Sequence, residues 1–232
     1  MTRAAPRTHF DRSGLIRSLA GLADTAAATP PPLAARLGDW LDFNDAMLLF
    51  AALNGSKAAG VPTLPAHELG ATLARERDSL AEAIHAATTP GARTRIKWPQ
   101  PDPEAPEGAT TDYAPYHRYY LAQQREIEIR SGHLRSAVRD ALAACKPALR
   151  QLAALDAAFD KALGPRERSL LAKVPLVLEK RFAQLRDAAP TGDWLAIFAR
   201  EMRDVLLAEL ETRLAPVTGL IETLSNEEAG QG

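Results

Sequence analysis

The chain has 232 residues, of which 46% are hydrophobic and 25% are charged, and its formal net charge is -1. This length and composition are typical of a soluble globular protein with a core that needs no disulfide or metal, and they exclude a largely disordered chain. The single cysteine, Cys145, excludes an internal disulfide and a metal site built from cysteines. No apolar run is long enough for a signal peptide or a membrane span, so we expect a cytoplasmic protein.

Alanine and leucine dominate the sequence and β-branched residues are few, so the expected fold class is all-α. In the first part of the chain, residues 1–88, the apolar spacing predicts a small helical subdomain. Its three helices are expected over about residues 11–24, 33–53 and 65–87. The prolines of ATPPP, at 28–32, end the first helix because proline supplies no amide donor.

The next segment, residues 89–112, interrupts every regular pattern. It contains Pro90, Pro99, Pro101, Pro103 and Pro106. Closely spaced prolines favour an extended and semi-rigid chain. We therefore expect a linker between the N-terminal subdomain and the rest of the protein.

Residues 113–226 carry the strongest helical signal. The first helix is expected from about Tyr113 to Cys145, with a repeating set of positions four and three residues apart that is typical of a coiled-coil seam. The seam consists of Tyr113, His117, Tyr120, Gln124, Ile127, Ser131, Leu134, Val138, Ala141 and Cys145. The whole region predicts an antiparallel bundle of long, coiled-coil-like helices, and residues 227–232 predict a disordered acidic tail.

Proline and glycine mark the expected helix boundaries within this bundle. Pro147 predicts the start of a new helix after the long one. Gly164 followed by Pro165 predicts the end of that helix and the start of the next. Pro175 predicts a kink near the middle of the following helix. A last long helix is expected after a cap at Thr191 or Asp193.

The sign of the charge changes along the chain. Residues 112–186 carry a net charge of +6, and residues 187–232 carry a net charge of -6. Helices of opposite sign that pack side by side explain this asymmetry, and a charged partner is the alternative. The pattern alone leaves both interpretations open.

Known catalytic and cofactor motifs are not found. Gly55 and Gly60 have phosphate-loop spacing, but Val61 and Pro62 stand where that loop needs lysine and serine or threonine. The stretch HELGA, at 67–71, lacks the second histidine of a zinc protease, and the histidines form no ligand pair three or four residues apart. We expect no catalytic residues, no cofactor and no metal.

All four tyrosines lie within eight positions at the start of the long helix, around a histidine. They are Tyr113, Tyr116, Tyr119 and Tyr120, with His117 between them. Packing at the edge of the core, with each hydroxyl reaching a polar partner, is one interpretation. A partner-binding hot spot and a small-ligand or catalytic site are the alternatives. On the seam register Tyr119 is expected to point away from the other three.

Two basic features are further candidate surfaces for a partner. Arg118, Arg125, Arg139 and Lys146 recur at multiples of seven outside the seam, which predicts a straight basic stripe for an acidic protein or a nucleic-acid backbone. A solvated outer face explains the same spacing. The hexamer RTRIKW, with Arg93, Arg95 and Trp98, is a candidate docking peptide, unless Trp98 folds back onto the bundle.

The C-terminal half of the chain also resembles a known family. Five stretches, which together cover most of 113–224, resemble in their order a bacterial, all-helical family of about this length that is a domain of unknown function. They are YHRYYLAQQREIE, LRSAVRDALA, LRQLAALDAAFDKAL, RERSLLAKVPLVLEKRF and VLLAELETRLAPVTGLIETL. ALNG, at 52–55, fits the same family. The matching residues are helix-packing residues, so no functional residue follows from them. The resemblance implies a cytoplasmic accessory subunit of an envelope assembly with motor-like or stator-like proteins.

These observations favour a non-enzymatic helical interaction or adaptor protein. Its expected partner is another helical protein or a second copy of the chain, with no membrane insertion. A regulatory helical protein that binds nucleic acid or a small ligand is the alternative. An enzyme that uses Tyr116 and Tyr119 is the least favoured hypothesis.

Overall fold

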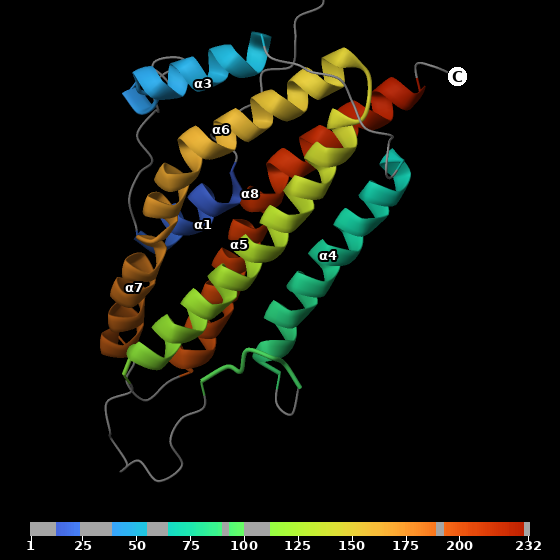
Figure 1. Ribbon diagram of the computed structural model, residues 1–232. Coiled ribbons are helices and arrows are strands. Elements are labelled where there is room, and N and C mark those ends of the chain that lie inside the picture. Colours follow the sequence, from blue (N-terminus) through green and yellow to red (C-terminus); the bar gives the residue numbers. More distant parts are fainter. Residues whose placement is uncertain are drawn as a thin grey trace, which may run out of the picture.

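The computed structural model describes residues 13–23, 39–54, 65–89, 93–99, 112–188 and 193–229, and all regular structure within these ranges is helical (Figure 1). The all-α prediction is therefore confirmed. The helices are α1 (Gly14–Ala23), α3 (Phe43–Asn54), α4 (Ala66–Ala87), α5 (Ala114–Ala143), α6 (Pro147–Leu171), α7 (Val174–Ala188) and α8 (Trp194–Ala229).

The centre of the molecule is the pair formed by α5 and α8, which run side by side in the same direction (Figure 1). Tyr120 of α5 meets Glu209 of α8, and Lys146, just beyond the end of α5, meets Glu227 further along α8. Residue numbers thus rise together along the two helices. This central pair is parallel, so the antiparallel arrangement predicted from the sequence does not hold for it.

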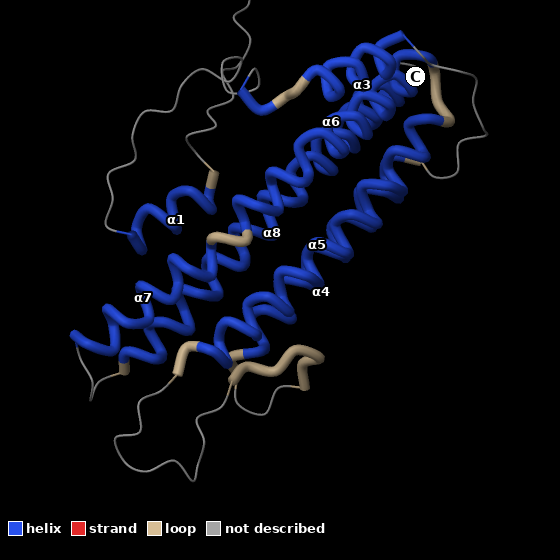
Figure 2. The backbone as a smooth tube through the Cα atoms, turned by 60° about the vertical axis from the view of Figure 1, so that its left-hand side comes forward, coloured by secondary structure: helices blue, strands red, loops and turns tan. Residues whose placement is uncertain are grey.

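Layers of helices with the opposite direction cover this pair. On one side, the backbone N–H of Ala66 at the start of α4 donates to Glu228 near the end of α8. Arg77, further along α4, pairs with Glu211, which lies nearer the start of α8. On the other side α6 and α7 descend along α5 and α8, and α3 lies on the outer side of α6 (Figures 1 and 2). The order of layers is therefore α4, the central pair, α6 with α7, and α3.

The helices within residues 1–88 do not pack together as a separate subdomain. α1 lies on α8 and α7, α3 lies on α6, and α4 lies on α8 and α5. Leu15 of α1 and Leu69 of α4 belong to the same continuous cluster of buried side chains as Leu206 of α8. Among the described residues the molecule has one core, to which α1 and α4 add separately, whereas α3 adds no buried residue.

α8 supplies the largest share of that core because its apolar positions cover a broad face. A helix surrounded by neighbours needs such a face, whereas a surface helix needs only a narrow stripe. The buried residues of α8 are Trp194, Phe198, Met202, Val205, Leu206, Glu209, Leu210, Leu214, Val217, Leu220, Ile221 and Leu224. Pro216, which lacks the amide donor for the helix ladder, is exposed.

The expected helix boundary at Gly164 and Pro165 is wrong. α6 continues through both residues to Leu171, and α7 begins at Val174. Pro165 is exposed, so water can solvate the carbonyl that loses its partner, and the helix tolerates the proline. Pro175, expected as a kink in mid-helix, instead lies in the first turn of α7, where its missing N–H has no consequence.

The end of α8 extends further than the sequence predicts. Residues 227–229, expected to begin a disordered tail, are helical. Glu227 pairs with Lys146, and Glu228 accepts the backbone N–H of Ala66. These two contacts fix the last turn of α8 to the neighbouring helices. The rest of the predicted tail lies outside the described residues.

Candidate functional site

The four tyrosines are buried, with at most 8% of each side chain exposed. Tyr119, which lies outside the predicted seam, is nevertheless only 4% exposed. Near its start α5 is covered by Trp98 as well as by α7 and α8, so the buried face is wider than a coiled-coil seam. His117, on the predicted seam, is only half-buried.

Aromatic rings from three other parts of the chain surround the tyrosines. Trp98 packs on Tyr116 and Tyr119, with ring centroids 5.3 and 5.0 Å apart. Phe182 of α7 and Phe198 of α8 contact each other at 5.0 Å, and both contact Tyr116. Tilted and edge-to-face contacts of this kind stabilise a core beyond the area they bury. The geometry agrees with the packing interpretation of the cluster.

Three of the tyrosine hydroxyls have specific partners. Tyr113 Oη donates to the carbonyl oxygen of Pro175 at 2.7 Å, and Tyr120 Oη donates to Glu209 Oε2 at 2.7 Å. Tyr119 Oη accepts from Gln123 Nε2 at 3.1 Å. Burial raises the pKa of all four phenols above the ordinary value of 10.0. The phenols therefore stay neutral at physiological pH, which makes them poor bases and nucleophiles.

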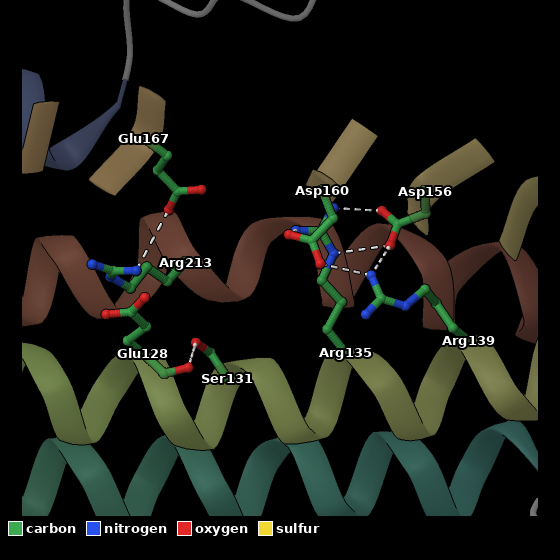
Figure 3. Close-up of polar contacts among 8 residues, drawn as sticks. All are labelled: Glu128, Ser131, Arg135, Arg139, Asp156, Asp160, Glu167 and Arg213. Atoms are coloured by element: carbon green, nitrogen blue, oxygen red, sulfur yellow. Dashed lines mark hydrogen bonds and ion pairs between the residues drawn. The ribbon is translucent and has the colours of Figure 1, made fainter. Parts of the chain in front are cut away.

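Glu209 is a fully buried carboxylate in the middle of the molecule. It accepts hydrogen bonds from Tyr120, from Gln124 Nε2 at 3.1 Å and from Arg213 Nε at 2.9 Å. Arg213 also faces Glu167 of α6 at 3.7 Å (Figure 3). The charge of Glu209 is thus neutralised and hydrogen-bonded, as a buried ion requires. This network ties α5, α6 and α8 together.

A second polar cluster joins α5 to α6 (Figure 3). The guanidinium of Arg135 binds both carboxylate oxygens of Asp156, at 2.7 and 2.9 Å, and also Asp160 at 2.9 Å. Arg139 reaches the same two carboxylates at 3.2 and 2.8 Å. Two positive and two negative charges, each partly buried, form one compact group. The cluster holds the two helices in register.

The predicted basic stripe is divided by these contacts. Arg139 belongs to the cluster with α6, and Lys146 pairs with Glu227 of α8. Arg118 and Arg125 are exposed, and neither pairs with a carboxylate in the described part of the chain. The opposite-sign segments noted in the sequence therefore supply, at least in part, pairs within the fold.

The RTRIKW hexamer lies against the bundle at the lower ends of α4 and α5 (Figures 1 and 2). Ile96 and Trp98 pack on the core, and Arg95 pairs with Glu126 of α5. Arg93 and Lys97 remain exposed. The apolar residues of the hexamer pack against the core, which leaves the exposed cations Arg93 and Lys97 available to a partner.

α3 carries a large exposed apolar surface, which we call the outward face of α3. It consists of Phe43, Met47, Phe50 and Leu53, whose exposed fractions are 79%, 52%, 62% and 49%. At about 100° per residue, these four side chains lie within roughly a third of the helix circumference. Single exposed apolar residues are common on proteins, whereas a contiguous patch indicates an interaction site.

The opposite side of α3 packs on α6. Leu48, Leu49 and Ala52 are half-buried there, and Gln151 Nε2 of α6 donates to the carbonyl oxygen of Leu53 at 2.6 Å. α3 is thus apolar on both sides and covered on one. A helix that is apolar all round is normally buried all round. The outward face of α3 is the candidate functional site.

The helix is well defined at its start despite this exposure. Asp42 Oδ1 accepts the N–H of Asp45 at 2.8 Å, and Asp45 Oδ2 accepts the N–H of Asp42 at 3.2 Å. Such a reciprocal capping box satisfies amide donors that a helix start leaves unpaired. With the exposed Asp39, the N-terminal end of α3 carries three carboxylates and no lysine or arginine over residues 39–54.

Sequence reasoning did not select this surface, although a signal was present. The run AMLLFAAL, at 46–53, is too short to span a membrane, and its apolar residues occupy every side of the helix. The tertiary structure is needed to show which side is covered.

None of the described helices combines the length and the apolar character needed to cross a bilayer. The described side chains also contain no group of three or more histidine, cysteine, aspartate or glutamate residues placed to hold a metal ion.

Comparison with known proteins gives one match. A family model described as "Protein of unknown function (DUF3348)" matches residues 1–226. Neither the search of curated proteins nor the search of solved structures gave a match.

Proposed function

Since the chain belongs to the DUF3348 family of proteins of unknown function, we propose its role from its geometry: a non-enzymatic helical interaction protein that docks a partner on the outward face of α3. The observation that carries the proposal is the exposure of Phe43, Met47 and Phe50 on a helix whose other side is already packed. Aromatic and methionine side chains are enriched at protein interfaces. Covering them removes apolar area from water, which favours association.

The partner we propose is an amphipathic helix of another protein, with lysine or arginine beside its apolar face. A helix laid along α3 can cover the apolar stripe, as in other helix-binding grooves. Asp39, Asp42 and Asp45 give this surface a negative end, so basic flanking residues complement it. The same carboxylates oppose an anionic membrane surface.

A binding role is also supported by the chemistry of the tyrosine cluster. Tyr116 and Tyr119, the residues of the enzyme hypothesis, have raised pKa values because they are buried. The nucleic-acid alternative depends on a basic stripe in which Arg139 and Lys146 already pair with carboxylates of the fold. Both alternatives therefore have less support than docking on α3.

The resemblance to a bacterial family adds a cellular setting to the proposal. We propose a cytoplasmic accessory subunit whose partner belongs to an envelope assembly. Cell fractionation and identification of the captured partner test this setting separately from the docking surface. A different partner would leave the role of α3 in place and replace only the setting.

The docking surface is tested with synthetic helices of about 14 residues, roughly four turns, added to the full-length protein. Two peptides share one apolar face and carry either lysine or glutamate beside it. We expect the lysine peptide to bind and the glutamate peptide to bind more weakly. Phe43→Ser/Phe50→Ser should weaken the lysine peptide at least about 30-fold, which corresponds to a hot spot of about 2 kcal/mol.

Leu121→Ser/Ile129→Ser is the matched control, because it removes two exposed apolar side chains from α5. It should leave peptide binding unchanged, and both double variants should keep the wild-type unfolding midpoint. Equal binding of the two peptides, or equal loss in both double variants, contradicts the proposal. Binding of anionic vesicles that requires Phe43 and Phe50 would assign the surface to membranes. A dimer disrupted by the α3 variant would assign it to a second copy of the chain.

A further inference from the structure

An open hollow of about 390 Å³ lies at the end of the molecule opposite to α3 along the bundle, where α4 ends and α8 begins. Its apolar walls are Trp98 and the first turns of α8, with Leu195, Ala196 and Ala199. Thr88, just after α4, contributes a polar edge. This volume is within the range of small-molecule sites, and apolar walls with a few polar groups are typical of them.

The ionisable groups that line the hollow are both guanidinium groups. Arg200 and Arg203 lie one turn apart on α8, and no carboxylate is among the lining residues. Arg200 is exposed and pairs with no acid in the described ranges. These two cations can attract an anion to the hollow.

Arg203 is half-buried, and no carboxylate lies within hydrogen-bond distance of it among the described residues. Its Nε is buried without a hydrogen-bond acceptor among the described residues, and the carboxylate of Asp204 is 4.0 Å away, beyond hydrogen-bond reach. Five other half-buried arginines do have a carboxylate oxygen within 2.9 Å: they are Arg130, Arg135, Arg139, Arg181 and Arg213. An anion in the hollow could instead bind the rest of the Arg203 guanidinium, since 28% of this side chain is exposed.

Trp98 gives the hollow a fixed planar wall. Its indole packs on Tyr116 and Tyr119 and is thereby held in place while it lines the hollow. A planar or apolar group can lie against this ring while its charge reaches the guanidinium groups. We propose that the hollow between Trp98 and Arg203 is a binding site for a small organic anion, a carboxylate or phosphate carried on an aromatic or apolar group.

Calorimetric titration of the full-length protein tests the site with defined probes. Phenyl phosphate and benzoate each combine the two features, whereas inorganic phosphate has only the charge and benzyl alcohol only the ring. We expect phenyl phosphate or benzoate to bind with 1:1 saturation. The two single-feature probes should bind at least about tenfold more weakly, a difference of about 1.4 kcal/mol. The comparison of phenyl phosphate with benzoate identifies the preferred acid.

Arg203→Gln should weaken the better probe by about tenfold or more, because it removes a charge-assisted hydrogen bond. Arg200→Gln should also weaken it, and this exposed position keeps the test valid if Arg203→Gln fails to fold. Arg118→Gln is the control, since it removes an exposed guanidinium that does not line the hollow. Absence of saturable binding of either acid up to millimolar concentration would overturn the proposal, and so would equal affinity in all three variants.

Discussion

At the scale of single residues, Glu209 shows how strongly the fold depends on one polar contact. Its carboxylate is fully buried and shared by Tyr120, Gln124 and Arg213. Glu209→Leu would remove this shared acceptor, leaving Gln124 with the carbonyl oxygen of Leu171 at 3.3 Å and Arg213 with Glu167 at 3.7 Å. We expect a loss of about 3–5 kcal/mol in the free energy of unfolding, measured by urea titration.

Two companion variants separate charge from shape at this position. Glu209→Gln keeps an acceptor oxygen, so its loss should be smaller than that of Glu209→Leu. Glu209→Leu combined with Arg213→Leu removes both charges and should recover part of the stability. If Glu209→Leu unfolds at the same urea concentration as wild type, the network contributes nothing to stability.

The four tyrosines predict how stability depends on alkaline pH. Burial raises the pKa of each phenol in the folded protein, with an added effect of Glu209 on Tyr120 and of Glu179 on Tyr113. Below pH 10 the phenols are protonated in both the folded and the unfolded chain, so the contribution of the buried, protonated phenols to the free energy of unfolding is fully present. Above pH 10 only the unfolded chain releases the protons, and stability falls by up to about 1.4 kcal/mol per pH unit for each tyrosine.

Spectrophotometric titration with parallel circular dichroism measures this effect. Tyrosinate absorbance should appear together with the loss of helical signal, because the folded protein keeps its phenols protonated. Tyrosinate formation near pH 10 in a protein that is still helical would show that the cluster is open to solvent.

Single residues also mark where sequence reasoning succeeds and where it stops. The heptad spacing correctly places Tyr120, Ile127 and Val138 in the core, because one face of α5 meets α8 along most of its length. It does not show that Tyr119, outside the seam, is also buried, because Trp98, which covers it, comes from a segment about twenty residues earlier in the chain. The hollow beside Arg203 was not predictable for the same reason: its walls come from three separate parts of the sequence.

At the scale of helices, two glycines in exposed positions limit stability without serving the packing. Apart from its chain neighbours and the backbone of its own helix, a Cβ at Gly132 of α5 or at Gly219 of α8 would have no heavy atom within 4 Å of it. Glycine within a helix costs about 0.5–1 kcal/mol relative to alanine. Gly132→Ala and Gly219→Ala should each raise the free energy of unfolding by about that amount, as measured by chemical denaturation.

Gly164→Ala is an informative comparison within α6. There the new Cβ would lie 3.4 Å from the guanidinium of Arg168, a flexible side chain that has to adjust. Its gain should be smaller than at the two open positions. Destabilisation by Gly132→Ala or Gly219→Ala would show that these helices are bent or covered at those points in solution.

The existence of most helices follows from local sequence, but their ends depend on the environment. Leu69, Leu80 and Ile84 have the spacing of a buried stripe, and α4 buries all three. Pro165 looks like a helix start in the sequence, yet α6 continues through it because that side faces water. The cost of a proline depends on whether its freed carbonyl is solvated, which local sequence does not specify.

At the scale of the whole molecule, stability should decrease from the centre outward. α5 and α8 have buried residues along their lengths, whereas α3 has none and, among the described helices, packs mainly on the outer side of α6. Helices with few buried contacts open locally at lower free energy. Native-state hydrogen exchange should therefore show the slowest amides in α5 and α8 and the fastest helical amides in α3.

A partner on the outward face of α3 should slow exchange there and leave α5 and α8 unchanged. Phe43→Ser/Phe50→Ser should abolish that effect without altering exchange in the free protein. Exchange in α3 as slow as in α8, measured on the protein alone, would mean that the outward face of α3 is already covered.

The place of α8 in the chain has a consequence for biosynthesis. α8 contacts α1, α4, α5 and α7, and of the described helices it is the last to leave the ribosome. Until it emerges, Tyr120 and Leu69 have no apolar surface of α8 to cover them. Contacts between distant parts of a chain form late and expose apolar surface meanwhile. Each nascent chain must therefore be kept from aggregating until nearly all of its helices have been synthesised.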